Sequence, residues 1–200
     1  MFRRAAVLIA LLAVAACGSA SAAPPPPAGT ERVVLAGGCF WGMEAVFGAL
    51  RGVRSATPGY SGGAASTAHY EMVSSGMTGH AESVEVVYDP HVISFAQLLD
   101  VYFTVAHDPT EKDRQGPDVG TQYRSEIFTT SDAQRRAALA AVRAIPGAVT
   151  IVAPLRAFYP AEAYHRNYVA RHPDEPYIVQ EDLPKLARLH QKFGALLASN

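Results

Sequence analysis

Hydrophobic and polar residues along 32–196 recur with the two periods expected of strands and helices. The apolar run 33–36 predicts a buried strand, which the pair Gly37-Gly38 ends. A helix is predicted to begin near Cys39, because the apolar residues after it recur at helical spacing: Phe40, Met43, Val46, Phe47 and Leu50. Cys39 therefore lies at the junction between a strand and a helix.

Residues 81–88 alternate in the manner of a strand, which places Glu82, Val84, Val86 and Tyr88 on one face. A carboxyl among apolar neighbours is unusual, because burial disfavours its charged form and raises its pKa. Glu82 could then serve as a neutral proton donor near pH 7. In the alternative interpretation, Glu82 lies at the start of the strand and frays into solvent.

The remaining elements are predicted from capping signals and periodicity. Ser94 with Gln97 forms a capping box before one helix, and Ser131 with Gln134 caps an Ala-rich helix to Ala144. The polar segment 107–124 is too long for a simple connection and is a candidate functional loop. Further predictions are strands at 126–129 and 149–152, a helix from Pro160 to Arg171, and a terminal helix at 183–193. Interleaved strands and helices predict one layered α/β or α+β domain.

The first 30 residues predict an export signal and a tether. A basic start at Arg3 and Arg4 precedes the apolar run 5–16, which is too short to span a bilayer. The sequence Val14-Ala15-Ala16-Cys17 resembles a bacterial lipobox, which implies lipidation of Cys17 and cleavage before it. The Ala-, Ser- and Pro-rich stretch that follows predicts an extended tether.

We therefore predict a signal peptide at 1–16, a lipid-anchor cysteine and Pro/Ala-rich tether at 17–30, and a folded domain at 31–200. The exported protein would be a lipoprotein held at the membrane, facing the periplasm or the cell exterior. In the alternative interpretation, ordinary signal cleavage within 19–22 removes Cys17 and leaves a soluble periplasmic or secreted protein.

Composition narrows the classes of function. The 17 basic and 18 acidic residues give a net charge of −1, which argues against a nucleic-acid partner. A hydrophobic content of 49% excludes wholesale disorder. Two cysteines cannot supply a disulfide framework or a multi-thiolate zinc site, and the seven histidines show no metal-ligand spacing, so no metal is predicted.

The candidate chemistry lies in Gly38-Cys39-Phe40-Trp41-Gly42. A thiol at a helix N-terminus meets free backbone N–H groups and the positive end of the dipole, which favour the thiolate. Phe40 and Trp41 point about 100° apart on a helix, so at least one of them should line a depression near the sulfur. The alternative is a buried structural cysteine that packs as a small hydrophobe.

Seven motifs together, in this order, resemble peptide methionine sulfoxide reductase A. They are Gly38-Cys39-Phe40-Trp41-Gly42, Gly59-Tyr60-Ser61-Gly62-Gly63, Gly79-His80-Ala81-Glu82, Tyr88-Asp89-Pro90, His107-Asp108-Pro109, Gly120-Thr121-Gln122-Tyr123-Arg124-Ser125 and Phe158-Tyr159-Pro160-Ala161-Glu162. The resemblance spans about residues 32–180. It implies an α+β fold, a two-layer sandwich in which a mixed sheet with a ferredoxin-like core is packed by helices.

The resemblance also implies an activity, the reduction of the S-epimer of methionine sulfoxide, free or in a polypeptide, without a metal or a bound cofactor. We expect the protein to be a monomer. Cys39 would attack the sulfoxide sulfur, and Glu82 would protonate the oxygen. This agrees with the chemistry, since a sulfoxide oxygen is a poor leaving group until it is protonated. Methionine is released and Cys39 becomes a sulfenic acid. The exported enzyme would thus repair oxidised envelope proteins.

Five further residues match substrate-binding positions of the family. Phe40 and Trp41 would hold the S-methyl group, Tyr70 and Tyr123 would hydrogen-bond the sulfoxide oxygen, and Asp118 is an acid of the same pocket. Without the resemblance, the two tyrosines would be taken as ordinary core or rim residues. Tyr60 is interpreted as a packing residue, and structural hydrogen bonding is expected of His80 and His107.

The chain departs from the family in one respect. Many members resolve the sulfenic acid with further cysteines near the C-terminus, whereas this sequence has none after Cys39. An external reductant, either a thioredoxin-like protein or a small thiol, must therefore act directly on Cys39. Cys17 is a poor candidate, because lipidation or cleavage removes it.

Two other classes of function compete with a reductase. A cysteine hydrolase or acyltransferase needs a histidine base oriented by a carboxylate or amide, and the Phe40-Trp41 pair does not suggest an acyl site. A lipoprotein module that only binds oxidised or Met-rich ligands would retain them without chemical conversion.

Overall fold

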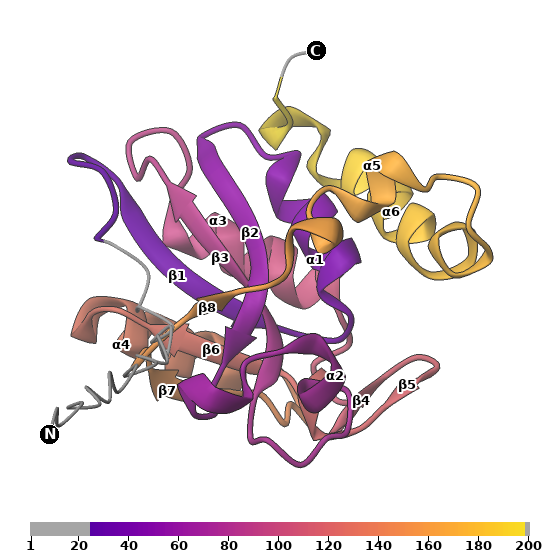
Figure 1. Cartoon of the computed structure of the whole chain (residues 1–200). Helices are drawn as coiled ribbons and strands as arrows, with labels where there is room; N and C mark the ends of the chain where they lie inside the picture. Colours follow the sequence, from indigo (N-terminus) through magenta and orange to yellow (C-terminus); the bar gives the residue numbers. More distant parts are fainter. Residues whose placement is uncertain (1–24, 199–200) are drawn as a thin grey trace, which may run out of the picture.

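The computed structural model describes residues 25–198, which contain a six-stranded mixed sheet (Figure 1). Across the sheet the strands are β7 (Ile151–Pro154), β6 (Glu126–Thr129), β1 (Glu31–Ala36), β3 (Ala81–Tyr88), β2 (Val53–Ser61) and β8 (Tyr159–Pro160). β6 and β7 are parallel, and the other neighbours are antiparallel.

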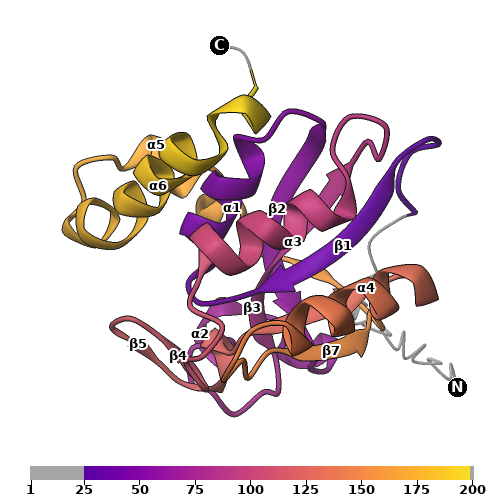
Figure 2. The same cartoon turned by 180° about the vertical axis from the view of Figure 1, so that it is seen from behind.

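The four central strands and two helices form a ferredoxin-like core. Along the chain the order is β1, α1 (Phe40–Gly48), β2, β3, α3 (Phe95–Val101) and β6, and in the sheet it is β6-β1-β3-β2. The helices α1, α3 and α4 (Asp132–Arg143) cover one face (Figure 2). This confirms the predicted α+β two-layer sandwich.

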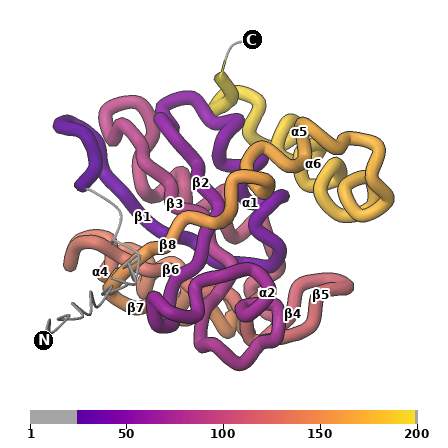
Figure 3. Tube along the Cα trace, in the orientation of Figure 1, coloured from indigo at the N-terminus to yellow at the C-terminus, as the bar shows by residue number. Residues whose placement is uncertain are grey.

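The opposite face of the sheet carries a smaller apolar cluster. Val34, Ala36, Ala81 and Phe128 pack there against Phe158. Phe158 lies in the connection between β7 and β8, which passes over this face from one edge of the sheet to the other (Figure 3). Because both faces are covered, β3 is buried along almost its whole length.

Most of the predicted elements are confirmed. The strands at 81–88 and 126–129, and the helix α6 (Leu183–Phe193), have the predicted bounds. Ser94 and Gln97 form a reciprocal capping box before α3. The candidate loop 107–124 contains a short hairpin, β4 (Arg114–Gln115) and β5 (Asp118–Val119), and a 3-10 turn, η3 (Thr121–Tyr123).

The helix predicted from Pro160 to Arg171 is wrong. Pro160 lies in β8 opposite Gly59, and the backbone N–H of Ala161 donates to the Pro58 carbonyl. Pairing with the edge of β2 therefore outweighs the helix-starting preference of proline. Only a 3-10 turn, η4 (Ala163–His165), and the short α5 (Tyr168–Arg171) follow, separated at Asn167 by a left-handed φ of 51°.

The sequence pattern did not predict β2, whose centre contains the turn-like pair Pro58-Gly59. Gly59 is required there by close packing, because a Cβ would collide with the carbonyl oxygen of Tyr159 and the ring of Phe158. The nine-residue strand is nevertheless paired along its length with β3.

The predicted signal peptide 1–16 and Cys17 lie outside the described residues. Within 25–198, no helix is long and apolar enough to cross a membrane.

Candidate active site

Cys39 is the N-cap residue of α1, directly after β1 and the positive-φ residue Gly38. Its side chain is almost buried, with 8% of its surface exposed. A Cβ at Gly38 would collide with the side chain of Gln115 from the β4–β5 hairpin. The glycine therefore allows the hairpin to pack closely beside the thiol.

The helix start favours the thiolate form of Cys39, as predicted, but burial outweighs its effect in the resting protein. Burial raises the pKa of the Cys39 thiol well above its ordinary value, and the nearby carboxyls of Glu82 and Asp182 raise it further. The backbone N–H of Trp41 and the ammonium of Lys185 lower the pKa, but by less. Desolvation therefore outweighs the helix N-terminus, and the resting side chain is a thiol.

Glu82 lies on β3, with 2% of its surface exposed, and is paired with Tyr60 of β2 rather than frayed into solvent. Its Oε2 accepts a hydrogen bond of 3.2 Å from the backbone N–H of Phe40. Burial raises the pKa of Glu82 to about 8, opposed by the Phe40 N–H and assisted by repulsion from Asp118. The burial and the raised pKa favour the interpretation of Glu82 as a neutral carboxyl near pH 7 over a side chain frayed into solvent.

Phe40 and Trp41 differ in burial: Phe40 is fully buried, whereas Trp41 is half-buried. Neither ring lines the polar cavity that contains Cys39, so a depression beside the sulfur lined by one of them stays a prediction. The indole ring of Trp41 is stacked on Tyr168, with centroids 3.8 Å apart and planes 8° apart. Its Nε1 donates to Nδ1 of His165 at 3.0 Å, and Tyr177 meets the ring edge-on.

Tyr70 begins the short helix α2 (Tyr70–Val73), and its ring is stacked 6.5 Å from that of Phe40. Burial and the neighbouring Glu82 and Cys39 raise the pKa of Tyr70 to about 12. Both phenols named by the resemblance are therefore protonated hydrogen-bond donors at neutral pH, because burial and the nearby acids raise the pKa of Tyr123 as well.

Asp118 accepts a hydrogen bond from the hydroxyl of Tyr177, and its pKa is raised by burial. Asp118 and Cys39 line the same polar cavity of 230 Å³, beside Lys185. The structure thus brings together all seven residues that the resemblance placed in the site: Cys39, Phe40, Trp41, Tyr70, Glu82, Asp118 and Tyr123.

Several residues of the site were missed from the sequence. His165 accepts the Trp41 N–H and lies 4.5 Å from the ring of Tyr70, while Glu162 accepts the backbone N–H of Tyr70. Asp182 and Lys185 form an ion pair of 3.1 Å. The motif that ends at Glu162 was the only feature of the sequence that pointed to this part of the chain. Local periodicity does not predict that the C-terminal segment packs against α1.

The structure agrees with the structural roles predicted for Tyr60, His80 and His107. Tyr60 is fully buried, and its hydroxyl donates to Glu162. His80 contacts the backbone of Gly63 and Ala64. His107 contacts the Tyr102 carbonyl and the Ser125 hydroxyl, and burial lowers its pKa to about 4.

These contacts argue against acyl transfer. His107 lines the same cavity as Cys39, but both of its ring nitrogens are occupied by other partners, so it cannot serve Cys39 as a base. Within residues 25–198, no group of three or more His, Cys, Asp or Glu side chains is arranged to hold a metal ion. A buried thiol beside a neutral carboxylic acid fits the chemistry of a thiol-based oxidoreductase.

Comparison with known proteins agrees with this class. The family model "Peptide methionine sulfoxide reductase" matches residues 31–196. "Peptide methionine sulfoxide reductase MsrA 2" of Mesorhizobium japonicum is 49% identical over 175 residues, which are 84% of this chain and 90% of that protein. "Peptide methionine sulfoxide reductase MsrA" of Thermus thermophilus is 49% identical over 172 residues, 84% of this chain and 97% of that protein.

Among solved structures, methionine sulfoxide reductase A of Corynebacterium diphtheriae is similar with a TM-score of 0.66 at 34% identity, over 74% of this chain and 77% of that one. The chain belongs to the peptide methionine sulfoxide reductase A family. It is an oxidoreductase, a peptide-methionine (S)-S-oxide reductase, which sets aside the acyl-transfer and binding-module alternatives.

The buried Glu82 should make the stability of the fold depend on pH. In the folded chain its pKa is about 8, whereas an unfolded glutamate titrates near about 4.3. Between these values the folded state holds a proton that the unfolded state releases, so the free energy of unfolding falls as pH rises through this interval.

Glu82→Gln should remove this decline and be increasingly stabilised relative to wild type from about pH 5 to about pH 8. Urea unfolding across this range measures the difference. The exposed Glu71→Gln on α2 is the control and should parallel wild type. A constant difference between Glu82→Gln and wild type at every pH would contradict the assigned pKa.

Proposed function

We propose that Cys39 and Glu82 carry out the reduction, with Cys39 as the nucleophile and Glu82 as the acid. The observation that supports this most strongly is the buried, neutral Glu82, fixed by the Phe40 N–H at the first turn of the helix that Cys39 caps. A neutral acid is required, because the sulfoxide oxygen leaves only after it is protonated.

The remaining residues of the site bind the substrate. Phe40 and Trp41 hold the S-methyl group, and the phenols of Tyr70 and Tyr123 donate hydrogen bonds to the sulfoxide oxygen. Asp118, held by Tyr177, supports the polar side of the pocket. The apolar and polar sides together select a small methyl sulfoxide, free or within a polypeptide.

The first half of the reaction transfers two electrons from one thiol. The Cys39 sulfur forms a bond to the sulfoxide sulfur, and the oxygen leaves as water after it takes the proton of Glu82 and the proton of the Cys39 thiol. Water then attacks the Cys39 sulfur, the S–S bond breaks with its electron pair on methionine, and a proton of that water returns to Glu82. The net change is sulfoxide plus thiol to methionine plus sulfenic acid, which conserves atoms and electrons.

The second half needs an external thiol. Cys39 is the only free cysteine of the described residues, and Cys17 is the only other cysteine in the sequence. A thioredoxin-like protein or a small thiol displaces the hydroxyl of the sulfenic acid as water, and a second thiol releases Cys39 from the mixed disulfide.

The site of action is the cell envelope. The basic and apolar start of the chain and the sequence Val14-Ala15-Ala16-Cys17 support export, lipidation of Cys17 and attachment of the domain to a membrane. There the enzyme repairs oxidised envelope proteins.

The roles of Cys39 and Glu82 are tested by single-turnover formation of methionine. Cys39→Ser should form none, and Glu82→Gln should slow the step by about 10²–10⁴-fold, the usual contribution of a general acid. The wild-type rate should fall as pH rises through about 8, where Glu82 loses its proton, and the Glu82→Gln rate should not follow that decline.

Glu85→Gln, on the same strand but paired with Arg32, is the matched control and should react at the wild-type rate. Methionine formation by Cys39→Ser, or wild-type speed in Glu82→Gln, would show that other groups perform these roles.

Recycling is tested by counting products. A chain that begins at Thr30 should release one methionine per enzyme when no thiol is added, because one thiol supplies two electrons. Cys39 should then be heavier by about 16 Da and react with dimedone. Added thiol should restore turnover at a rate that rises with its concentration. Release of two methionines per enzyme without reductant would refute the scheme.

The anchor is tested by intact-mass analysis of the native protein. The mature chain should begin at Cys17, carry a diacylglyceryl group and sediment with membranes. The Cys17→Ser variant should lose both the lipid and the membrane association. A soluble wild-type chain that begins after Ala20 or Ala22 would establish ordinary signal cleavage instead.

A further inference from the structure

The orientation of Trp41 is controlled by residues far from it in sequence. The hydrogen bond from its Nε1 to His165 fixes one edge of the indole, and the stacked ring of Tyr168 covers one face at 3.8 Å. The edge contact with Tyr177 lies at 6.0 Å. Three of the contacts that orient the indole therefore come from residues 165–177.

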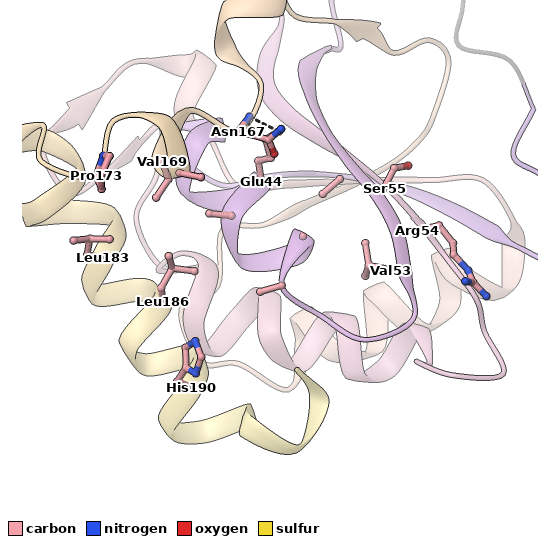
Figure 4. A pocket seen from close by; sticks show the side chains of 15 residues that line it. Glu44, Val53, Arg54, Ser55, Asn167, Val169, Pro173, Leu183, Leu186 and His190 are labelled. Carbon is pink, nitrogen blue, oxygen red and sulfur yellow. Dashed lines mark hydrogen bonds between the residues drawn. The ribbon is translucent and has the colours of Figure 1, made fainter. Parts of the chain in front are cut away.

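The segment that carries Tyr168 is in turn fastened to α1 by Glu44. Both carboxylate oxygens of Glu44 accept the backbone N–H of Asn167, at 2.9 and 2.8 Å (Figure 4). Glu44 is buried, with 7% of its surface exposed, and burial raises the pKa of its carboxyl. Asn167 has a left-handed φ of 51°, which this contact holds in place.

Trp41 and Glu44 are three residues apart on the same helix, so their side chains lie on the same face. One turn of α1 therefore carries both Trp41, which would contact the S-methyl group, and Glu44, which holds the segment of Tyr168 against that indole ring. A shift of Asn167 would move Tyr168, and the indole would lose the support of one face.

We propose that Tyr168 and Glu44 are positioning residues for substrate binding: Glu44 fixes Tyr168, and Tyr168 fixes the indole plane of Trp41 against the S-methyl group. This inference rests on the proposed role of Trp41. Neither residue touches the reacting sulfur or oxygen, so their loss weakens binding of the sulfoxide without changing the chemistry of the bound state.

The test separates binding from chemistry in single-turnover reactions at increasing concentrations of free methionine sulfoxide. Tyr168→Leu should raise the half-saturating concentration about 3–10-fold, the range expected for one aromatic contact, and leave the saturating rate within about 2-fold of wild type. Tyr168→Phe retains the ring and should restore wild-type binding. Glu44→Leu should shift binding in the same direction as Tyr168→Leu, because leucine has no oxygen to accept the Asn167 N–H. Glu44→Gln keeps one acceptor oxygen and should bind more nearly like wild type.

Fluorescence gives a second readout, since Trp41 is the only tryptophan in the sequence. Tyr168→Leu and Glu44→Leu should shift its emission to longer wavelength, because the indole gains contact with water, and Tyr168→Phe should not. Phe95→Leu is the control: it removes a half-buried aromatic ring on α3 and should change neither binding nor emission.

The amount of methionine released per enzyme counts the folded, active molecules, so partial unfolding of a variant lowers the yield and not the apparent affinity. Unchanged half-saturation and emission in Tyr168→Leu would overturn the inference. A lower saturating rate with unchanged half-saturation would do so as well. Neither result would contradict the proposed roles of Cys39 and Glu82, because those roles are tested separately by Cys39→Ser and Glu82→Gln.

Discussion

The hydrogen bond between the Phe40 N–H and the Glu82 carboxyl is the constraint on which the site depends. The first N–H groups of a helix have no partner within it, and that of Phe40 is buried, so it needs an acceptor. Glu82 supplies it from the neighbouring strand. The bond joins the start of α1 to β3. It therefore fixes the position of the Cys39 thiol relative to the Glu82 carboxyl.

This arrangement also sets the protonation of the site. The Phe40 N–H favours the carboxylate form of Glu82, but burial and Asp118 favour the neutral form by more. The carboxyls of Glu82 and Asp182 in turn oppose ionisation of Cys39. Below about pH 8 the pocket therefore holds protons on both the acid and the thiol. In the proposed mechanism these are the two protons that the sulfoxide oxygen takes when it leaves as water.

The sequence predicts the N-terminal half of the site well and the C-terminal half poorly. The strand that carries Glu82 and the helix that follows Cys39 are each encoded by a local period, and their contact then follows from adjacent strands. The strand β2 escapes prediction because Pro58 and Gly59 resemble a turn, although in the fold they accommodate β8 and Phe158.

The supports of Trp41 escape prediction for a different reason. His165, Tyr168 and Tyr177 occupy a segment with little regular structure, in which one residue has a left-handed backbone. Their function arises only from packing against α1, more than a hundred positions earlier in the chain. Pro160 shows the same effect, since pairing with β2 decides its conformation against its local preference for a helix start.

The C-terminal segment packs against the helix that follows Cys39 and supports its first turn. Asp182, fully buried and paired with Lys185, packs so closely on the first turn of α1 that a Cβ at Gly42 would collide with its carboxylate. A segment packed in this way cannot swing a distant residue into contact with the sulfur without pulling the buried Asp182 carboxyl away from α1. In the proposed mechanism, recycling of Cys39 is therefore left to a thiol that arrives from solution.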